Sequence, residues 1–187
     1  MSTISIVYFS ATGTTKSLAE AIAAGAGAGA VLLPIDGKQI VDGRFTDNEF
    51  LAKASAGDAI VFGTPTFMGG VAGQFKAFAD ATGGIWYQRG WVNKLAGGFT
   101  TSGSASGDKQ GTLQYLVTLG MQHGMLWVGQ PDVNGLYAGQ SPEQAVNRLG
   151  SHTGVMGQAA PGQPLTPGDL ETGRRYGARI ADLLAKR

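Results

Sequence analysis

Cysteine is absent from this 187-residue chain, and charged residues make up only 14% of it. Without cysteine there is no disulfide, no thiolate nucleophile and no cysteine-ligated zinc or iron–sulfur cluster. The two histidines, His123 and His152, have no partner at ligand spacing, so we expect no metal site. Redox chemistry in this chain would therefore have to come from a bound cofactor.

An excess of either charge is also missing, because 14 lysines and arginines face 13 acidic residues for a net charge of +1. The basic residues are scattered, which argues against nucleic-acid binding and against a polybasic membrane surface. The chain has no apolar run of about 18 residues and begins without the features of a signal peptide, so we expect a soluble, cytoplasmic protein with no membrane partner. Its length and 43% hydrophobic content fit a single domain over residues 1–187.

Short apolar runs alternate with helical patterns along the chain. The strand-like runs cover residues 4–9, 30–35, 58–63, 95–100 (interrupted by two glycines) and 125–129. Helical periodicity covers residues 15–26, 71–83, 113–124 and 166–187. This alternation predicts an α/β fold in which helices cover both faces of a doubly wound, five-stranded parallel sheet, with ligands at the carboxyl ends of the strands. Residues 130–165 show little periodicity and are predicted to form a functional or subunit-contact loop.

A hydroxyl-rich loop follows the first predicted strand and opens the first helix. It consists of Ser10, Ala11, Thr12, Gly13, Thr14 and Thr15. A helix N-terminus carries partial positive charge and free N–H groups, and the hydroxyls can donate hydrogen bonds, so the loop suits a phosphate without a lysine. The alternative is an ordinary Ser/Thr N-cap. The chain contains neither a P-loop lysine motif nor a nucleophile elbow, since Ala105 stands where the elbow needs a serine.

Three loops together resemble those of the flavodoxin-like FMN-binding family. They are the hydroxyl-rich loop, residues 64–70 (TPTFMGG) after the third strand, and residues 100–104 (TTSGS) after the fourth. Residues 73–76, 82–86 and 122–125 are similar, more closely, to the WrbA type of NAD(P)H:quinone oxidoreductase. The resemblance implies a flavodoxin-like sheet of strand order 2-1-3-4-5, FMN as cofactor, NAD(P)H as co-substrate, a quinone as acceptor, and a homo-oligomer, either dimer or tetramer.

The resemblance also divides FMN among the loops. It implies that the first loop holds the phosphate, the second runs beside the ribityl chain and the ring, and the third lines the other edge of the ring. Glycines in the second loop would let the backbone approach a flat ring or adopt positive φ, although a plain turn before a helix is the alternative. The implied cofactor-binding residues are Ser10, Ala11, Thr12, Gly13, Thr14, Thr15, Pro65, Thr66, Phe67, Met68, Gly69, Gly70, Thr101, Ser102, Gly103, Ser104, Gly107 and His123.

Two further residues have competing interpretations. His123 precedes Gly124 at a predicted helix end, where the helix dipole alone favours a histidine. The resemblance instead implies a catalytic role for His123, as a donor near the pyrimidine edge of the flavin. It places Trp86 close to the flavin of a neighbouring subunit, whereas core packing or a lid over the ring is the alternative. Phe67 stands where the family usually has an arginine, a charge that would help a dinucleotide to dock.

Three functions follow as hypotheses. In the first, FMN accepts a hydride from NAD(P)H and passes two electrons to a quinone, and the protein supplies position and electrostatics. In the second, the chain is a flavodoxin-type electron carrier. Such carriers are typically strongly acidic, and a net charge of +1 offers little field for steering toward a basic partner, so we rank it second. The third is a non-catalytic FMN-binding regulatory module.

Overall fold

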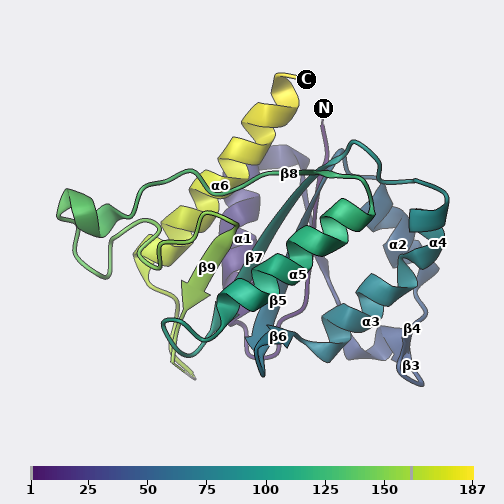
Figure 1. The fold of residues 1–187 in the computed structure, drawn as a ribbon, viewed down its shortest axis with the longest axis horizontal. Helices are drawn as coiled ribbons and strands as arrows, with labels where there is room; N and C mark the ends of the chain where they lie inside the picture. The colour runs from purple at the N-terminus through teal and green to yellow at the C-terminus, as the bar shows by residue number, and fades with distance from the viewer. Residues whose placement is uncertain (1, 161) are drawn as a thin grey trace.

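A parallel sheet lies at the centre of the computed structural model, which describes residues 2–160 and 162–187 (Figure 1). Its strands, in spatial order, are β2 (Ala30–Pro34), β1 (Ile4–Tyr8), β5 (Ala59–Phe67) and β7 (Leu95–Ser102), followed by β8 (Leu126–Trp127) and β9 (Val155–Gln158), which both pair with β7. The predicted doubly wound sheet of order 2-1-3-4-5 is therefore confirmed, with two short strands sharing the fifth position.

The fifth strand position is split by a long excursion. β8 pairs with Leu95 and Ala96 at the start of β7, and β9 pairs with residues 99–102 near its end. Residues 128–154 leave the sheet between them and include the short helix η3 (Gly135–Ala138), which lies far from the sheet in Figure 1. The strand predicted at 125–129 is therefore longer than the observed β8. Residues 130–165, which were predicted to form a loop, contain β9, the second strand at this edge of the sheet.

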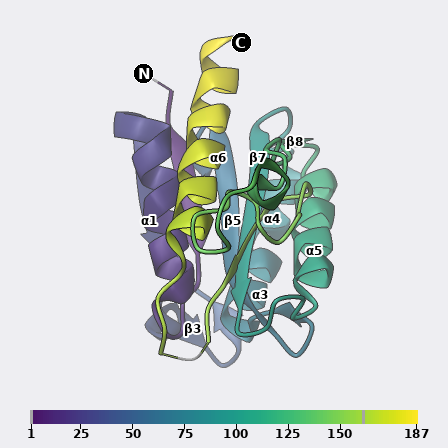
Figure 2. The same cartoon turned by 90° about the vertical axis from the view of Figure 1, so that its left-hand side faces the viewer.

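Helices cover both faces of the sheet (Figure 2). One face carries α1 (Thr14–Ala26) and α6 (Pro167–Ala185), and the other carries α2 (Asn48–Ser55), α3 (Gly73–Ala81), α4 (Gly83–Tyr87) and α5 (Lys109–Gln122). The remaining elements are η1 (Gly27–Gly29), η2 (Gly37–Gln39), the hairpin strands β3 (Ile40–Val41) and β4 (Arg44–Phe45), and β6 (Gly70–Val71). Every helix in the described part of the chain is too short or too polar to span a bilayer.

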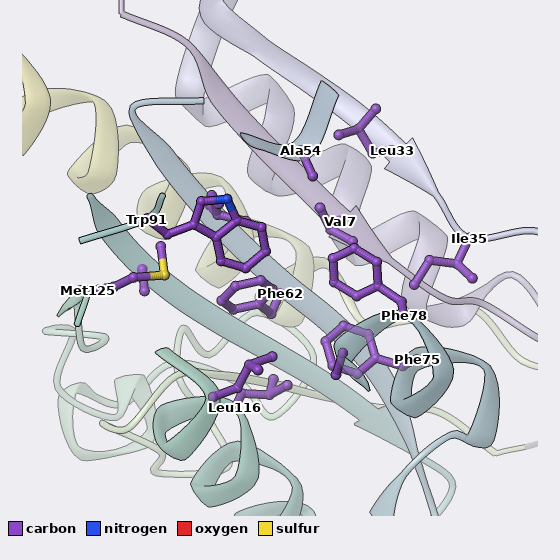
Figure 3. Packing of buried hydrophobic residues seen from close by; sticks show 14 of the residues in the cluster. Val7, Leu33, Ile35, Ala54, Phe62, Phe75, Phe78, Trp91, Leu116 and Met125 are labelled. Carbon is purple, nitrogen blue, oxygen red and sulfur yellow. The ribbon is translucent and has the colours of Figure 1, made fainter. Parts of the chain in front are cut away.

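Alternating side chains of β1 supply both cores, because successive residues of a strand point to opposite faces. Val7 belongs to the core under α2–α5, whereas Ile4 and Ile6 belong to the core under α1 and α6. The first of these cores is rich in aromatic rings, with Phe62 of β5 centred 6.3 Å from Phe75 and 6.0 Å from Trp91 (Figure 3).

Two helix boundaries differ from the sequence-based expectation. Val71 was predicted on the inner face of a helix, but it lies in β6, and α3 begins only at Gly73. The helix predicted to stop at Gly83 and Gly84 ends at Ala81, but a second helix that the sequence did not predict, α4, begins at Gly83. Glycine disfavours helix, but Ile85 packs against the aromatic core, and this tertiary contact outweighs the weak local preference.

Candidate cofactor site

The carboxyl ends of β1, β5 and β7 surround a cavity of about 240 Å³. All three predicted loops contribute to it, and so does a fourth segment that directly follows β9. The lining residues are Ala11, Thr12, Thr14, Thr15, Pro65, Thr66, Phe67, Thr101, Ser102, Gly103, Ala159 and Ala160. The structure therefore brings together, in one place, residues that are up to 149 positions apart in the chain.

The first loop presents hydrogen-bond donors toward this cavity. The N-cap of α1 is Gly13, with a φ of 94°, so the ordinary Ser/Thr N-cap is not what the structure contains. Ser10 Oγ instead accepts the N–H groups of Gly13 and Lys16, at 3.2 and 3.1 Å, and so fixes the shape of the loop. Within residues 2–160 and 162–187, the N–H groups of Thr14 and Thr15 have no acceptor. They are open to an anion at the positive end of α1.

Paired threonine hydroxyls form the floor of the cavity. The Oγ1 atoms of Thr15 and Thr101 lie 2.7 Å apart, and this buried hydrogen bond joins the first loop to β7. Thr66 Oγ1 lies 2.8 Å from the hydroxyls of both Thr100 and Thr112. Their donors and acceptors are largely committed to one another, so Thr12 and Thr14 are the better placed hydroxyls for a ligand.

The second loop is a tight hairpin. β5 continues to Phe67, which pairs with Gly70 of β6. The two turn residues between them, Met68 and Gly69, have φ of 48° and 79°, as a type I′ turn requires. Positive φ is therefore confirmed for Gly69 but not for Gly70. The second residue with positive φ is instead Met68. Phe67 lines the cavity and is 49% exposed, and Met68, Gly69 and Gly70 lie outside its lining.

A lysine that the sequence-based reasoning missed lies beneath the third loop. Lys109, the first residue of α5, is buried, and its Nζ donates to Ser102 Oγ (2.8 Å), Ser104 O (2.7 Å) and Ala105 O (3.0 Å). Burial lowers the pKa of Lys109 to about 8. The available signal was its position, because a cation at a helix N-terminus opposes the dipole and needs a reason to be there. Ser104 and Gly107 shape this loop without lining the cavity.

The fourth segment is held by a buried ion pair. Arg148 binds both carboxylate oxygens of Asp169, at 2.8 and 2.9 Å, and also the carbonyl and side chain of Gln158. Gln158 Nε2 in turn donates to Gly103 O at 2.9 Å. These hydrogen bonds therefore connect four segments beside the cavity: residues 128–154, β9, α6 and the third loop. No sequence pattern pointed to Ala159 and Ala160, because β9 itself was not predicted.

His123 lies at the other end of the sheet from the cavity. It follows α5, whose 14 residues rise about 1.5 Å each and so span about 21 Å from the third loop. Thr82 Oγ1 donates to Ala79 O, so it accepts a hydrogen bond from His123 Nε2 at 2.9 Å. The expectation that His123 joins the three loops within one chain is not met, since the antiparallel course of α5 carries it away from them.

Burial also keeps His123 uncharged. The ring is 4% exposed, it lies 4.3 Å from the Trp91 ring, and burial lowers its pKa to about 4. With Nε2 donating to Thr82, its Nδ1 is buried without a partner within the described residues. His123 borders a shallow hollow on this end of the molecule, together with Trp86, Tyr87, Arg89, Val92, Met121, Gln122 and Gly124. Trp91 is core, whereas Trp86 is 49% exposed.

Known proteins match this chain in sequence and in fold. Residues 6–136 match the family described as NADPH-dependent FMN reductase. The chain is 41% identical over 186 residues to a protein named Flavodoxin FldP from Pseudomonas aeruginosa strain UCBPP-PA14, covering 97% of this chain and 96% of that protein. It is 34% identical over 202 residues to an NAD(P)H dehydrogenase (quinone) from Geobacter metallireducens, covering 97% of each.

A solved structure agrees with these sequence matches. The crystal structure of the flavodoxin, WrbA-like protein from Agrobacterium tumefaciens superimposes on this chain with a TM-score of 0.77 at 41% identity, covering 100% of this chain and 99% of that one. The chain therefore belongs to the NADPH-dependent FMN reductase family, among its flavodoxin-like, WrbA-type members, and its cofactor is FMN.

Proposed function

We propose that this protein is an FMN-dependent oxidoreductase that transfers two electrons from NAD(P)H to a quinone. One observation carries the proposal: three loops of the chain and a fourth segment meet at one cavity. Hydrogen-bond donors that can bind an anion lie at one side of it, and the half-exposed ring of Phe67 lies at the other. The family match supports FMN as cofactor and NAD(P)H as electron donor, and the printed name of the Geobacter relative supports a quinone as acceptor.

The chain's own residues divide the binding of FMN. The hydroxyls of Thr12 and Thr14, with the free N–H groups at the start of α1, would hold the phosphate. Pro65 and Phe67 would pack along the ring, and Ser102 with Gly103 would border its other edge. Bound FMN supplies hydride acceptance and two-electron transfer, so the protein needs to provide only position, electrostatics and access.

Phe67 gives the exposed side of the cavity an apolar surface. It is half exposed and occupies the position where an arginine is usual in the family, so a nicotinamide or quinone ring would be received by stacking and not by charge. Offset aromatic contacts are worth about 0.5 to 1.5 kcal/mol beyond area burial, which is enough to orient a ring without fixing its substituents. This supports flat, exchangeable substrates.

His123 and Trp86 can serve the flavin only in an assembly. Both lie at the far end of α5 from the cavity of their own chain. We therefore propose a homo-oligomer, a dimer or a tetramer, in which the hollow that they border faces the cavity of another subunit. The half-exposed Trp86 ring is the contact that such an arrangement would cover.

Reduction of the bound flavin tests the function. The purified protein is loaded with FMN, and NADH or NADPH is added without oxygen while the visible band of the oxidised flavin is followed. We expect the band to bleach with one of the dinucleotides and to return on addition of a benzoquinone. A protein that binds riboflavin as tightly as FMN would lack the proposed phosphate site, and one that takes up no FMN at all would refute the proposal.

An electron carrier is the second candidate, favoured by the 41% identity to a protein named Flavodoxin FldP. The same experiment separates the two. A carrier would not be bleached by NADH or NADPH but would be reduced by a reductase or a low-potential chemical donor. Bleaching without reoxidation by the quinone would contradict the quinone step while leaving FMN binding in place.

A further inference from the structure

We propose that Lys109 is a positioning residue for FMN: it holds the third loop in its binding conformation and places a positive charge beside the cofactor cavity. The inference rests on the proposed FMN site and assigns a role to a residue outside its lining. Lys109 is fully buried. Ser102, to whose Oγ it donates at 2.8 Å, lines the cavity, so the ammonium lies one side chain away from it.

The contacts of Lys109 set the direction of the loop peptides. Its Nζ donates hydrogen bonds to the carbonyl oxygens of Ser104 and Ala105, at 2.7 and 3.0 Å. The C=O and N–H of a trans peptide point in opposite directions, so the N–H groups of Ala105 and Ser106 point away from the ammonium. Both residues are exposed, and these N–H groups have no acceptor among the described residues. Lys109 thereby leaves two loop donors facing outward.

The packing around this contact leaves little room for another arrangement. The loop turns through Gly107 and Asp108, both at a φ of 52°. A Cβ at Gly107 would lie 2.1 Å from Ser102 Oγ, the atom that accepts a hydrogen bond from Lys109. The loop can therefore close over the lysine only because residue 107 has no side chain.

The charge of Lys109 is not cancelled by a carboxylate. The charged groups that face it are Asp169 on α6, which raises its pKa, and Arg148 from residues 128–154, which lowers it. These two groups pair with each other at 2.8 and 2.9 Å and largely neutralise one another. Within the described part of the chain, Lys109 forms no ion pair, so a net positive charge is left below the loop.

Such an arrangement is unfavourable without an anion nearby. Burial of an ammonium costs free energy, and the N-terminal position of Lys109 in α5 places its charge at the positive end of the helix. If the only role of Lys109 were to donate hydrogen bonds to the loop carbonyls, an uncharged donor side chain would be sufficient. A phosphorylated flavin, which gains further negative charge on reduction, is the kind of ligand that would compensate both costs. Ionisable groups with shifted pKa values are concentrated at functional sites.

Lys109→Met tests the proposal, with Lys94→Met as the matched control. Lys94 Nζ also donates to two backbone carbonyls, Ser55 O and Gly57 O, but Lys94 lies directly before β7, at the other end of the sheet from the cavity. Lys109→Arg keeps the charge. FMN affinity, from quenching of flavin fluorescence, and the midpoint potential of bound FMN are measured at pH 7, with thermal melts of the apo-proteins.

We expect Lys109→Met to weaken FMN binding by about tenfold or more, the usual effect of losing hydrogen bonds to a charged group, and to make the midpoint potential more negative. Lys94→Met should leave both unchanged, and Lys109→Arg should retain most of the affinity. The difference in FMN affinity between parent and Lys109→Met should be present at pH 7 and shrink as pH rises above about 8, because the lysine of the free protein then loses the charge that attracts the anion.

A lower melting temperature of Lys109→Met with unchanged FMN affinity and unchanged potential would overturn the proposal, because the lysine would then only support the fold. A difference that persists undiminished at high pH would overturn the role of its charge. If the parent protein takes up no FMN, the proposed function fails and this inference fails with it, whereas failure of Lys109 alone leaves FMN binding by the parent intact.

Discussion

Burial, more than position along a helix, decides the chemistry of His123. At the end of α5 the helix dipole would favour an imidazolium, but the ring lies between Thr82 and Trp91 and is almost completely covered. Burial lowers its pKa to about 4, so at neutral pH the ring is an uncharged hydrogen-bond donor. A flavin role for His123 stays a prediction, and it would require a neutral donor contributed by another subunit.

The lowered pKa makes stability depend on His123 as the pH falls. The folded protein releases the proton at about pH 4 and the unfolded chain at about 6.5, so between these values the unfolded state binds more protons. Stability is therefore full above about pH 7 and is lost toward pH 4, by on the order of 3 kcal/mol. His123→Gln should unfold more easily at pH 7, because it loses the Trp91 contact, but with a flatter pH dependence.

Urea unfolding at pH 7.5, 6 and 5 measures this slope. His152→Gln is the control, since His152 is exposed and its Nδ1 meets only the carbonyl of Gln130. The control should keep the slope of the parent. Equal slopes for the parent and His123→Gln would show that the ring is not held neutral.

At the residue scale, the sequence predicted which segments line the cavity better than which of their atoms face it. The hydroxyls of residues 10–15 were grouped correctly around the helix start, yet Ser10 turns its oxygen toward the loop itself, and Thr15 is paired with Thr101. Lys109 was overlooked because its burial depends on a loop folding back over it. Such assignments depend on tertiary contacts between residues distant in the chain, which local patterns do not contain.

At the scale of elements, the β5–β6 hairpin is the feature with the clearest local strain. A type I′ turn requires positive φ at both central residues, for which Asn-Gly is the favoured pair, and here Met68 occupies the first position at a φ of 48°. Its side chain is completely exposed and so loses little by replacement.

Met68→Asn should stabilise the apo-protein by about 0.5 to 1 kcal/mol, because asparagine adopts the left-handed region at a lower cost than methionine. Gly69→Ala, at a φ of 79°, should destabilise it by about 1 kcal/mol. Gly70→Ala is the matched control, since a Cβ there meets open space and the residue is not at positive φ. Thermal unfolding of the three variants provides the comparison, and a loss of stability in Met68→Asn would show that Met68 makes contacts not expected of an exposed side chain.

Helices and strands with a clear local sequence pattern were predicted well, whereas strands broken by glycines or by a long insertion were not. The N-terminal cap of α6 was correct, because Thr166 accepts the N–H of Asp169 as expected. The strand with two glycines runs two residues further than predicted, because Thr101 pairs with Pro65 of β5 and Ser102 pairs with Gln158 of β9. β9 was missed because its four residues are separated from β8 by residues 128–154, so no local pattern joins them.

At the scale of the whole molecule, α5 separates two surfaces that the family resemblance assigns to one flavin site. The cavity lies at the carboxyl ends of the strands, and the hollow beside Trp86 and His123 lies about 21 Å away at the other end of the helix. A net charge of +1 offers little electrostatic resistance to self-association. Both observations favour an assembly in which one subunit completes the site of the next.

Trp86→Glu tests this assembly, because a carboxylate at a covered aromatic contact must either remain solvated or keep the subunits apart. In light scattering we expect the parent to have the mass of a dimer or a tetramer and the variant that of a monomer. The variant should still bind FMN through the loops of its own chain but should lose most of its quinone reduction. Val41→Glu is the control, since Val41 is 54% exposed on β3, lies outside the lining of both the cavity and the hollow, and should leave both mass and turnover unchanged. A monomeric parent with full turnover would instead mean that the cavity of a single chain is sufficient, and that His123 and Trp86 act only in packing.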